Sequence, residues 1–134
     1  MKPQTRSVDR HVESRLKKEL VIWLVTAGSD GKPQAVPVWF EWDGRSFLIY
    51  AQDGAKVRDV ESNPDVELHL NSDEVGEDVV RVSGRARIEN RRPRHASAGY
   101  MRKYGKHIRS LGMKPEEYAA TYHNVIRVRG LRWH

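Results

Sequence analysis

The sequence contains no cysteine among its 134 residues. That absence excludes disulfide bonds, iron–sulfur clusters, zinc sites with thiolate ligands and cysteine nucleophiles. Long apolar runs are also missing, and no stretch approaches the ~20 residues that a membrane-spanning helix needs. Residues 1–20 are charged and lack the apolar core of a secretory signal. We therefore expect a single cytoplasmic domain without a membrane span.

Motifs for chemistry carried by the protein itself are equally scarce. The six histidines include no i, i+4 pair, so their spacing predicts no metal site. The sequence has no G-x-S-x-G nucleophile elbow, no G-x-G-x-x-G and no Walker lysine. We therefore predict no metal and no catalytic side chain.

Positive charge exceeds negative charge, with 24 Lys+Arg against 18 Asp+Glu and a formal net charge of +6. The excess is concentrated in a basic block over residues 81–109, where Glu89 is the single acidic residue. Residues 53–78 are acidic instead, and their two bases are Lys56 and Arg58. The basic block would attract nucleic acid, anionic lipid or a polyanionic cofactor, unless it is a solvated face without a partner.

Hydrophobic patterning predicts a mainly β chain. Apolar or alternating runs indicate six strands, over 21–25, 35–42, 46–51, 66–70, 80–88 and 125–129. Turn residues separate several of these runs by only a few positions, and tight hairpins favour antiparallel pairing. The expected architecture is therefore a six-stranded antiparallel β-barrel.

Helices are expected in three places. Val12 and Leu16, four residues apart among charged residues, predict an N-terminal helix at about 5–19. A short helix is expected over 53–62, and a helical insert, opened by a proline, at about 93–122. These helices complete one domain over the whole chain.

Lys56 and Arg58 lie at the start of the expected short helix, inside the acidic segment. Amide groups at a helix N-terminus together with one or two cations form a phosphate-binding site. Alternatively, the two basic side chains pair with Asp53, Asp59 and Glu61, which are close in the sequence. The sequence leaves both interpretations open.

Five short motifs occur in an order that resembles a known superfamily. They lie at 31–40 (GKPQAVPVWF), 43–44 (DG), 56–58 (KVR), 63–66 (NPDV) and 81–86 (RVSGRA). The arrangement resembles the pyridoxamine 5'-phosphate oxidase-like superfamily, and more narrowly its small actinobacterial branch of flavin/deazaflavin oxidoreductases that use coenzyme F420. The resemblance implies a split β-barrel of the FMN-binding type, assembled as a homodimer with the cofactor in a groove at the subunit interface.

The resemblance also implies where the cofactor binds. Backbone groups of the strand over 36–40 would line the ring, and residues 50–51 with the start of the short helix would hold the phosphate side. The implied cofactor-binding residues are Val36, Pro37, Val38, Trp39, Tyr50, Ala51, Lys56, Val57 and Arg58. Pro37, which has no N–H, would provide either a flat surface for the ring or a protected edge strand. Strand alternation places Trp39 and Phe40 on opposite faces.

The implied activity is hydride transfer between F420 and a small planar electron-poor acceptor, such as a quinone or an enone, with the cofactor supplying the chemistry. The alternatives are an FMN-dependent oxidoreductase of the same fold and a non-enzymatic flavin- or heme-binding protein. Nucleic-acid binding is disfavoured because Trp39, Phe40 and Trp42 lie outside the basic block. With F420, the basic block would attract the phosphodiester and oligoglutamate tail of the coenzyme.

Overall fold

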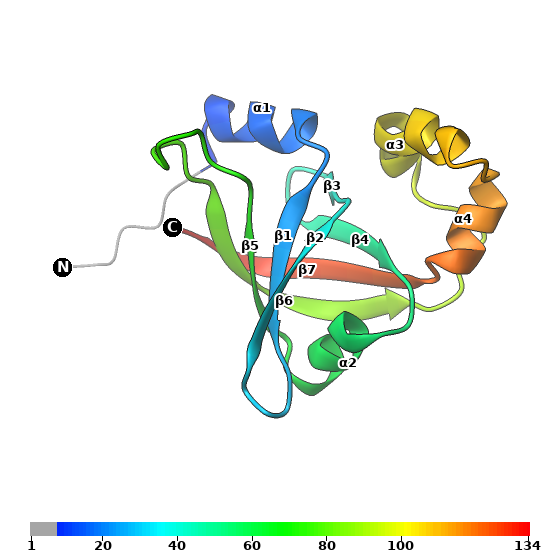
Figure 1. Cartoon of the computed structure of the whole chain (residues 1–134), viewed down its shortest axis with the longest axis horizontal. Coiled ribbons are helices and arrows are strands. Elements are labelled where there is room, and N and C mark those ends of the chain that lie inside the picture. The colour runs from blue at the N-terminus through cyan, green and yellow to red at the C-terminus, as the bar shows by residue number, and fades with distance from the viewer. Residues whose placement is uncertain (1–7) are drawn as a thin grey trace.

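The computed structural model describes residues 8–134. In chain order, its elements are α1 (Arg10–Lys18), β1 (Ile22–Ala27), β2 (Pro33–Val38), β3 (Glu41–Trp42), β4 (Phe47–Ala51), α2 (Ala55–Ser62), β5 (Asp65–His69), β6 (Arg81–Asn90), α3 (Ala98–Ser110), α4 (Pro115–Thr121) and β7 (Asn124–Trp133). Within these residues seven strands form one antiparallel sheet in the order β2-β1-β5-β6-β7-β4-β3. The sheet curls around an apolar interior (Figure 1). The predicted antiparallel split β-barrel is confirmed.

The sheet has seven strands rather than six because the strand predicted over 35–42 is interrupted. β2 ends at Val38, and β3 begins at Glu41. Between them, the backbone N–H of Phe40 donates to the Tyr104 hydroxyl at 2.9 Å. Tyr104 belongs to α3 and is 64 residues away in the sequence, so long-range packing imposes the break.

The interior of the curled sheet holds the larger hydrophobic core. α1 contributes Val12 and Leu16, which are both buried, and α2 contributes Val57 and Val60. α1 lies within the range predicted for the N-terminal helix, whose residues 5–7 fall outside the described residues. Both helices thus turn one apolar side toward the sheet, as their sequence spacing predicts.

A second apolar cluster lies on the outer face of the sheet, where α3 and α4 pack beside β4 and one end of β7 (Figure 1). β4 is buried along its whole length because Ile49 faces the interior while Leu48 and Tyr50 face the helices. Burial on both faces explains why this strand is a continuous apolar run rather than an alternating one.

α3 and α4 occupy the region of the predicted helical insert, but α3 does not begin at the proline. It begins at Ala98, because the Ser97 side chain caps the helix by accepting a hydrogen bond from the N–H of Tyr100 at 3.2 Å. The N–H of Ser97 in turn donates to the Tyr50 hydroxyl at 2.8 Å. These two bonds tie the start of α3 to β4.

Candidate functional site

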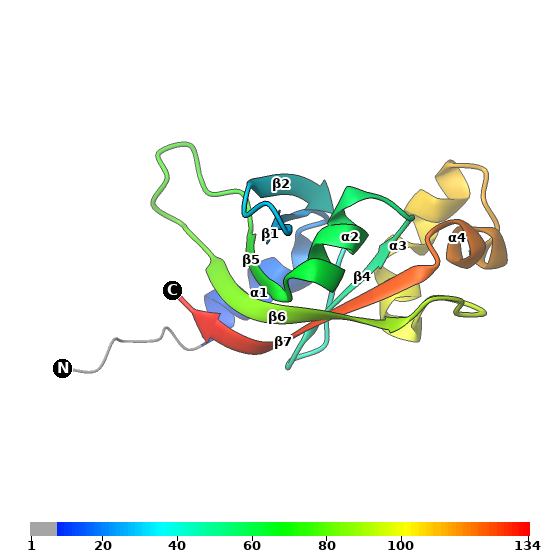
Figure 2. The same ribbon diagram turned by 90° about the horizontal axis from the view of Figure 1, so that it is seen from below.

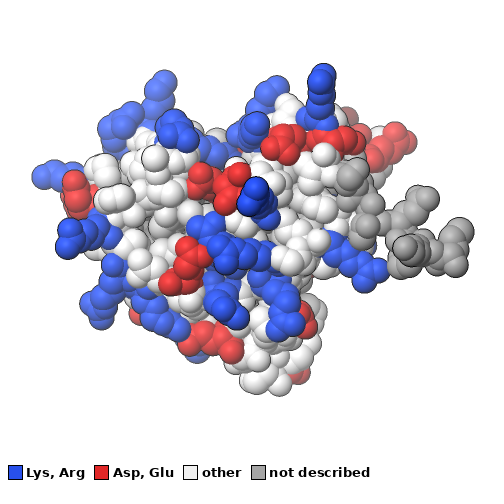
Figure 3. Space-filling model, turned by 180° about the vertical axis from the view of Figure 1, so that it is seen from behind, with Lys and Arg blue, Asp and Glu red and all other residues white. Residues whose placement is uncertain are grey.

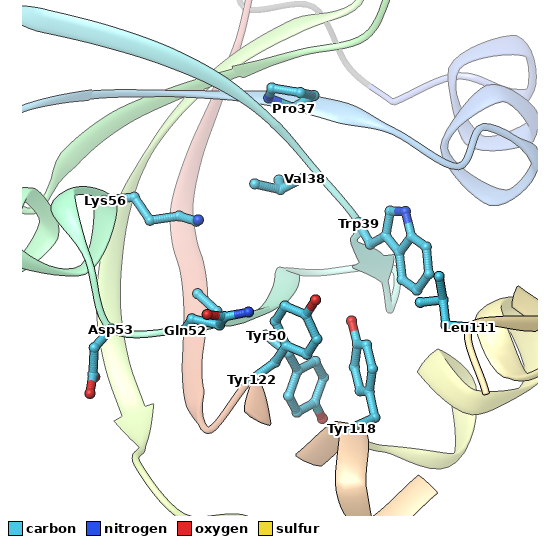
Figure 4. Close-up of a pocket in the computed structure, with 11 residues that line it drawn as sticks. Pro37, Val38, Trp39, Tyr50, Gln52, Asp53, Lys56, Leu111, Tyr118 and Tyr122 are labelled. Atoms are coloured by element: carbon cyan, nitrogen blue, oxygen red, sulfur yellow. The ribbon is translucent and has the colours of Figure 1, made fainter. Parts of the chain in front are cut away.

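A pocket of about 400 Å³ lies where the sheet fails to close (Figure 4). Among the described residues β2 pairs only with β1, and beyond its first two residues β4 pairs only with β7. Both open edges contribute to the pocket, together with the start of α2, the end of α3 and residues at α4. The lining residues are Pro37, Val38, Trp39, Tyr50, Ala51, Gln52, Asp53, Lys56, Leu111, Tyr118 and Tyr122. The pocket therefore offers backbone groups without a strand partner to a ligand.

One side of the pocket is aromatic. The ring of Trp39 stacks on Tyr104, with centroids 4.7 Å apart and planes within 5°. It also stacks on Tyr118 at 6.0 Å and 15°. Phe40, the next residue, is fully buried in the interior core, which confirms the predicted opposite orientation of Trp39 and Phe40. A flat, rigid aromatic wall of this kind suits a planar ligand.

Two adjacent side chains of α3 hold the backbone next to Trp39. The Tyr104 hydroxyl accepts a hydrogen bond from the N–H of Phe40 and donates to the carbonyl oxygen of either Leu20 (2.8 Å) or Phe40 (3.0 Å). The Lys103 ammonium group donates to the Phe40 carbonyl at 3.1 Å and lies 3.7 Å from the centroid of the Phe40 ring. The polar backbone groups at the strand break are thus satisfied from α3, which fixes the position of Trp39.

Lys103 is held in a partly buried position between α3, α1 and the strand break. Its ammonium group also donates to the carbonyl oxygen of Leu16, in the last turn of α1, at 3.2 Å. Burial lowers the pKa of Lys103 from its usual 10.5 to about 8, although the carboxylates of Glu41 and Glu19 act in the opposite direction. Lys103 therefore binds its proton less tightly in the folded chain than in the unfolded chain.

Lys103→Met should flatten the pH dependence of stability between about pH 8 and 10.5. In that window the unfolded chain keeps the Lys103 proton while the folded chain releases it, so the wild-type free energy of unfolding rises with pH. We expect the wild type to gain about 1 kcal/mol more than the variant, after allowance for the part of the side chain that water reaches. Urea unfolding across the window measures this difference, with the exposed Lys106→Met on the same helix as control. Equal slopes for wild type and Lys103→Met would contradict the prediction.

Lys56 supplies positive charge at another side of the pocket. It lies in the first turn of α2, and Figure 4 shows its side chain extended into the pocket. The N-cap of α2 is Gly54, which has no side chain to bond the first N–H groups of the helix. A free ammonium group and free helix amides together are suited to a phosphate.

The neighbouring acids do not neutralise Lys56. Within residues 8–134, the side chains of Lys56 and Arg58 form no ion pair. The acids bind other groups: Asp53 binds Asn124 and His123, Asp59 binds Thr26, and Glu61 binds Arg91. The interpretation in which these acids pair with Lys56 and Arg58 is therefore wrong, because the fold turns the carboxylates toward other partners.

Asp53 lies at the rim of the pocket, with its side chain directed away from that of Lys56 (Figure 4). A hydrogen bond from the Asn124 amide at 2.8 Å and the charge of His123 lower the pKa of Asp53. The carboxylate therefore stays ionised and bound to its neighbours. Its place in the site is structural support for the turn between β4 and α2.

The structure brings most of the implied cofactor-binding residues together. Six of the nine line the pocket, namely Pro37, Val38, Trp39, Tyr50, Ala51 and Lys56. The other three do not: Val36 is partly buried on β2, Val57 lies in the interior core, and Arg58 is exposed on α2. The contacts of all nine with a cofactor stay a prediction.

Sequence reasoning missed five lining residues, Gln52, Asp53, Leu111, Tyr118 and Tyr122. The available signal was the four-residue spacing of Tyr118 and Tyr122 behind a proline, which places both rings on one side of a helix. That spacing does not say which surface the helix covers.

No residue of the basic block lines the pocket. The block divides between the outer face of β6, the segment that joins β6 to α3, and the helix α3, on which Arg102, Lys106 and Arg109 are exposed. Its residues would therefore meet only a part of a cofactor that extends beyond the pocket.

Residues 8–134 contain no group of three or more His, Cys, Asp or Glu side chains arranged to hold a metal ion. None of the helices in this part of the chain has the length and apolar character needed to cross a bilayer.

Comparison with known proteins identifies the family to which this fold belongs. A profile of the pyridoxamine 5'-phosphate oxidase family matches residues 8–134. No curated protein sequence gives a significant match. A solved structure from Listeria innocua, provisionally named a pyridoxamine 5'-phosphate oxidase, is similar with a TM-score of 0.67 and 18% identity over 95% of this chain and 98% of that chain.

Two further structures are similar. An F420 reductase has a TM-score of 0.61 and 27% identity over 91% of this chain and 92% of that chain. HutZ, a heme storage protein from Vibrio cholerae, has a TM-score of 0.56 and 14% identity over 96% of this chain and 92% of that chain. The family match covers nearly the whole chain. The chain therefore belongs to the pyridoxamine 5'-phosphate oxidase family and has the fold of its flavin- and deazaflavin-binding oxidoreductases.

Proposed function

We propose that the protein is an oxidoreductase that binds coenzyme F420 in the pocket and transfers hydride to a small planar electron-poor acceptor, such as a quinone or an enone. One observation carries this proposal: the pocket has an aromatic wall at Trp39 and, at a helix N-terminus, Lys56, which forms no ion pair within residues 8–134. The F420 reductase, 27% identical, supports this choice of cofactor.

The residues present fit both parts of such a cofactor. The ring would lie along Pro37 and Val38 beside Trp39, where the β2 edge offers unpaired backbone groups. The phosphate would lie at Lys56 and the first amides of α2, which receive no hydrogen bond from a capping side chain among the described residues. Pocket volumes near 400 Å³ are within the range of roughly 300–1,000 Å³ that is typical of small-molecule sites.

The proposal includes a homodimer that covers the pocket. Leu111 lines the pocket and 59% of its surface is exposed, so the pocket has an apolar side chain that is open to solvent. A second subunit over Leu111 and the open β2 edge would exclude water, as hydride transfer requires.

The bound cofactor would supply the hydride chemistry itself. The chain's residues bind and orient: Trp39 and Tyr118 position a planar group, and Lys56 holds its charge. Burial raises the pKa of Tyr118 to about 12, so its hydroxyl keeps its proton at neutral pH. Its hydroxyl also shares a hydrogen bond of 2.7 Å with the Tyr100 hydroxyl, so Tyr118 stays neutral and does not act as a base.

FMN is the second candidate, because its terminal phosphate would occupy the same place at Lys56. Heme is less well supported, because no histidine, cysteine or methionine is among the residues that line the pocket.

Fluorescence and absorbance titrations of the purified protein with F420, FMN and hemin test this proposal. We expect F420 to bind with a Kd in the range of about 1–10 μM, at least about tenfold tighter than FMN. The loaded protein should then reduce or oxidise a quinone in a steady-state assay. The absence of binding by both F420 and FMN in the micromolar range would overturn the assignment as an oxidoreductase.

A further inference from the structure

A second hollow of about 600 Å³ lies on the outer face of β6 and β7. These two strands lie on the other side of the molecule from β2 (Figure 2). We call this second hollow the arginine hollow, because Arg85, Arg87, Arg127 and Arg129 line it. It shares no lining residue with the cofactor pocket. Figure 3 shows this side of the molecule, where basic side chains crowd around a few acidic ones.

The register of the sheet forces these arginines against one another. Arg85 lies directly opposite Arg129, and Arg87 directly opposite Arg127. Like charges in directly opposed positions destabilise a sheet, so a sequence selected for stability alone would avoid two such pairs in succession. Register shifts interrupt the β6–β7 pairing on both sides of this stretch, and such bulges bend a strand and redirect its side chains.

The charges of the hollow are only partly neutralised within the described residues. Arg127 binds Glu89 and Asp43, and Arg129 lies 3.8 Å from the same Glu89 carboxylate. Arg85 and Arg87 form no ion pair within residues 8–134.

The one acid opposite Arg85 does not change this balance. Asp65 faces Arg85 across the β5–β6 pair, but the two form no ion pair within 4.0 Å. The guanidinium groups of Arg85 and Arg87 therefore remain available to an anion from solution. The guanidinium group of Arg129 is partly available, because it shares the Glu89 carboxylate with Arg127.

The contact between Arg127 and Glu89 shows how such an anion would be held. The guanidinium binds both carboxylate oxygens, through Nε at 2.5 Å and Nη2 at 3.2 Å. The planar fork of arginine matches carboxylate and phosphate groups in this way. Neighbours on one face of a sheet are about 5 Å apart across strands and roughly 7 Å apart along a strand.

From this geometry we propose that the arginine hollow is a binding site for a ligand with two or more carboxylate or phosphate groups. Its anionic groups would engage Arg85 and Arg87, with Arg129 as the third contact. The site is independent of the proposed function, because it needs neither the pocket nor a cofactor.

Isothermal titration with inorganic pyrophosphate and with a tetraglutamate peptide tests the site on the cofactor-free protein at low salt. We expect at least one of these probes to bind at least about tenfold tighter than acetate, which carries a single charge. The double variant Arg85→Gln/Arg87→Gln should weaken that binding by at least about tenfold. The variant should melt no lower than the wild type, because it removes a repulsion.

The matched control is Arg102→Gln/Lys106→Gln, which removes two exposed charges from α3. It should change the affinity by less than about twofold, since both side chains lie away from the hollow. Equal losses in the two double variants would show attraction by net charge alone and overturn the proposal. The proposal would also be overturned if neither probe bound more tightly than acetate. Retained wild-type affinity in Arg85→Lys/Arg87→Lys would also overturn it, because the fork of arginine would then be unnecessary.

Discussion

Tyr104→Phe should lower the free energy of unfolding by about 2 kcal/mol and the melting temperature by roughly 6–10 °C. The substitution keeps the ring that stacks on Trp39 but removes the hydroxyl that accepts from the buried N–H of Phe40. That N–H cannot return to a strand ladder, because it lies at the break between β2 and β3. A buried donor without a partner costs about 1–3 kcal/mol, and a carbonyl oxygen also loses its donor.

The matched control is Tyr122→Phe. Tyr122 also lines the pocket and contacts the ring of Tyr118, but its hydroxyl makes no hydrogen bond within residues 8–134. Its removal should change the free energy of unfolding by less than about 0.5 kcal/mol. Urea unfolding of both variants measures the difference. Equal stabilities of the two variants would mean that the strand break does not depend on the Tyr104 hydroxyl.

The same interaction shows why the sequence predicts the sheet but not its break. The hairpin at Asp43-Gly44 is a local feature, because Asp43 bonds Ser46 within the turn and Gly44 has a positive φ of 95°. The break at Phe40 depends instead on a hydroxyl 64 residues away. Strand periodicity over 35–42 continues through the break, so nothing local marks it.

The candidate site likewise combines residues that local sequence motifs mark and residues that only long-range packing adds. Pro37 and Lys56 belong to short motifs that are visible in the sequence, and the structure places both on the pocket. Tyr118 joins them only because α4 packs beside β4, and the spacing of its tyrosines leaves that surface undetermined. The sequence does not decide whether Lys56 is paired, for a related reason. Sequence neighbours such as Glu61 are near in the chain, yet the fold gives Glu61 to Arg91.

Lys56→Gln should weaken the binding of a phosphate-bearing cofactor by roughly 10- to 100-fold, because a hydrogen bond to a charged group contributes about 1.5–3 kcal/mol. Lys56 is the single basic residue among those that line the pocket. The first-turn amides of α2 would remain and retain part of the affinity. Lys56→Glu should abolish measurable binding, since it places a carboxylate against the phosphate.

Comparing each cofactor with its phosphate-free form, in the wild type and in Lys56→Gln, separates a direct contact between Lys56 and the phosphate from a structural effect on the pocket. Each cofactor that the wild type binds is titrated beside its phosphate-free nucleoside, riboflavin for FMN and the deazaflavin nucleoside for F420. If Lys56 contacts the phosphate, Lys56→Gln weakens the phosphorylated form and leaves the nucleoside within about twofold. The exposed Lys32→Gln, in the β1–β2 turn, should cost less than about threefold. An equal loss for cofactor and nucleoside would mean that Lys56 acts on the shape of the pocket, and the phosphate would then have to lie elsewhere on the β2–β4 opening.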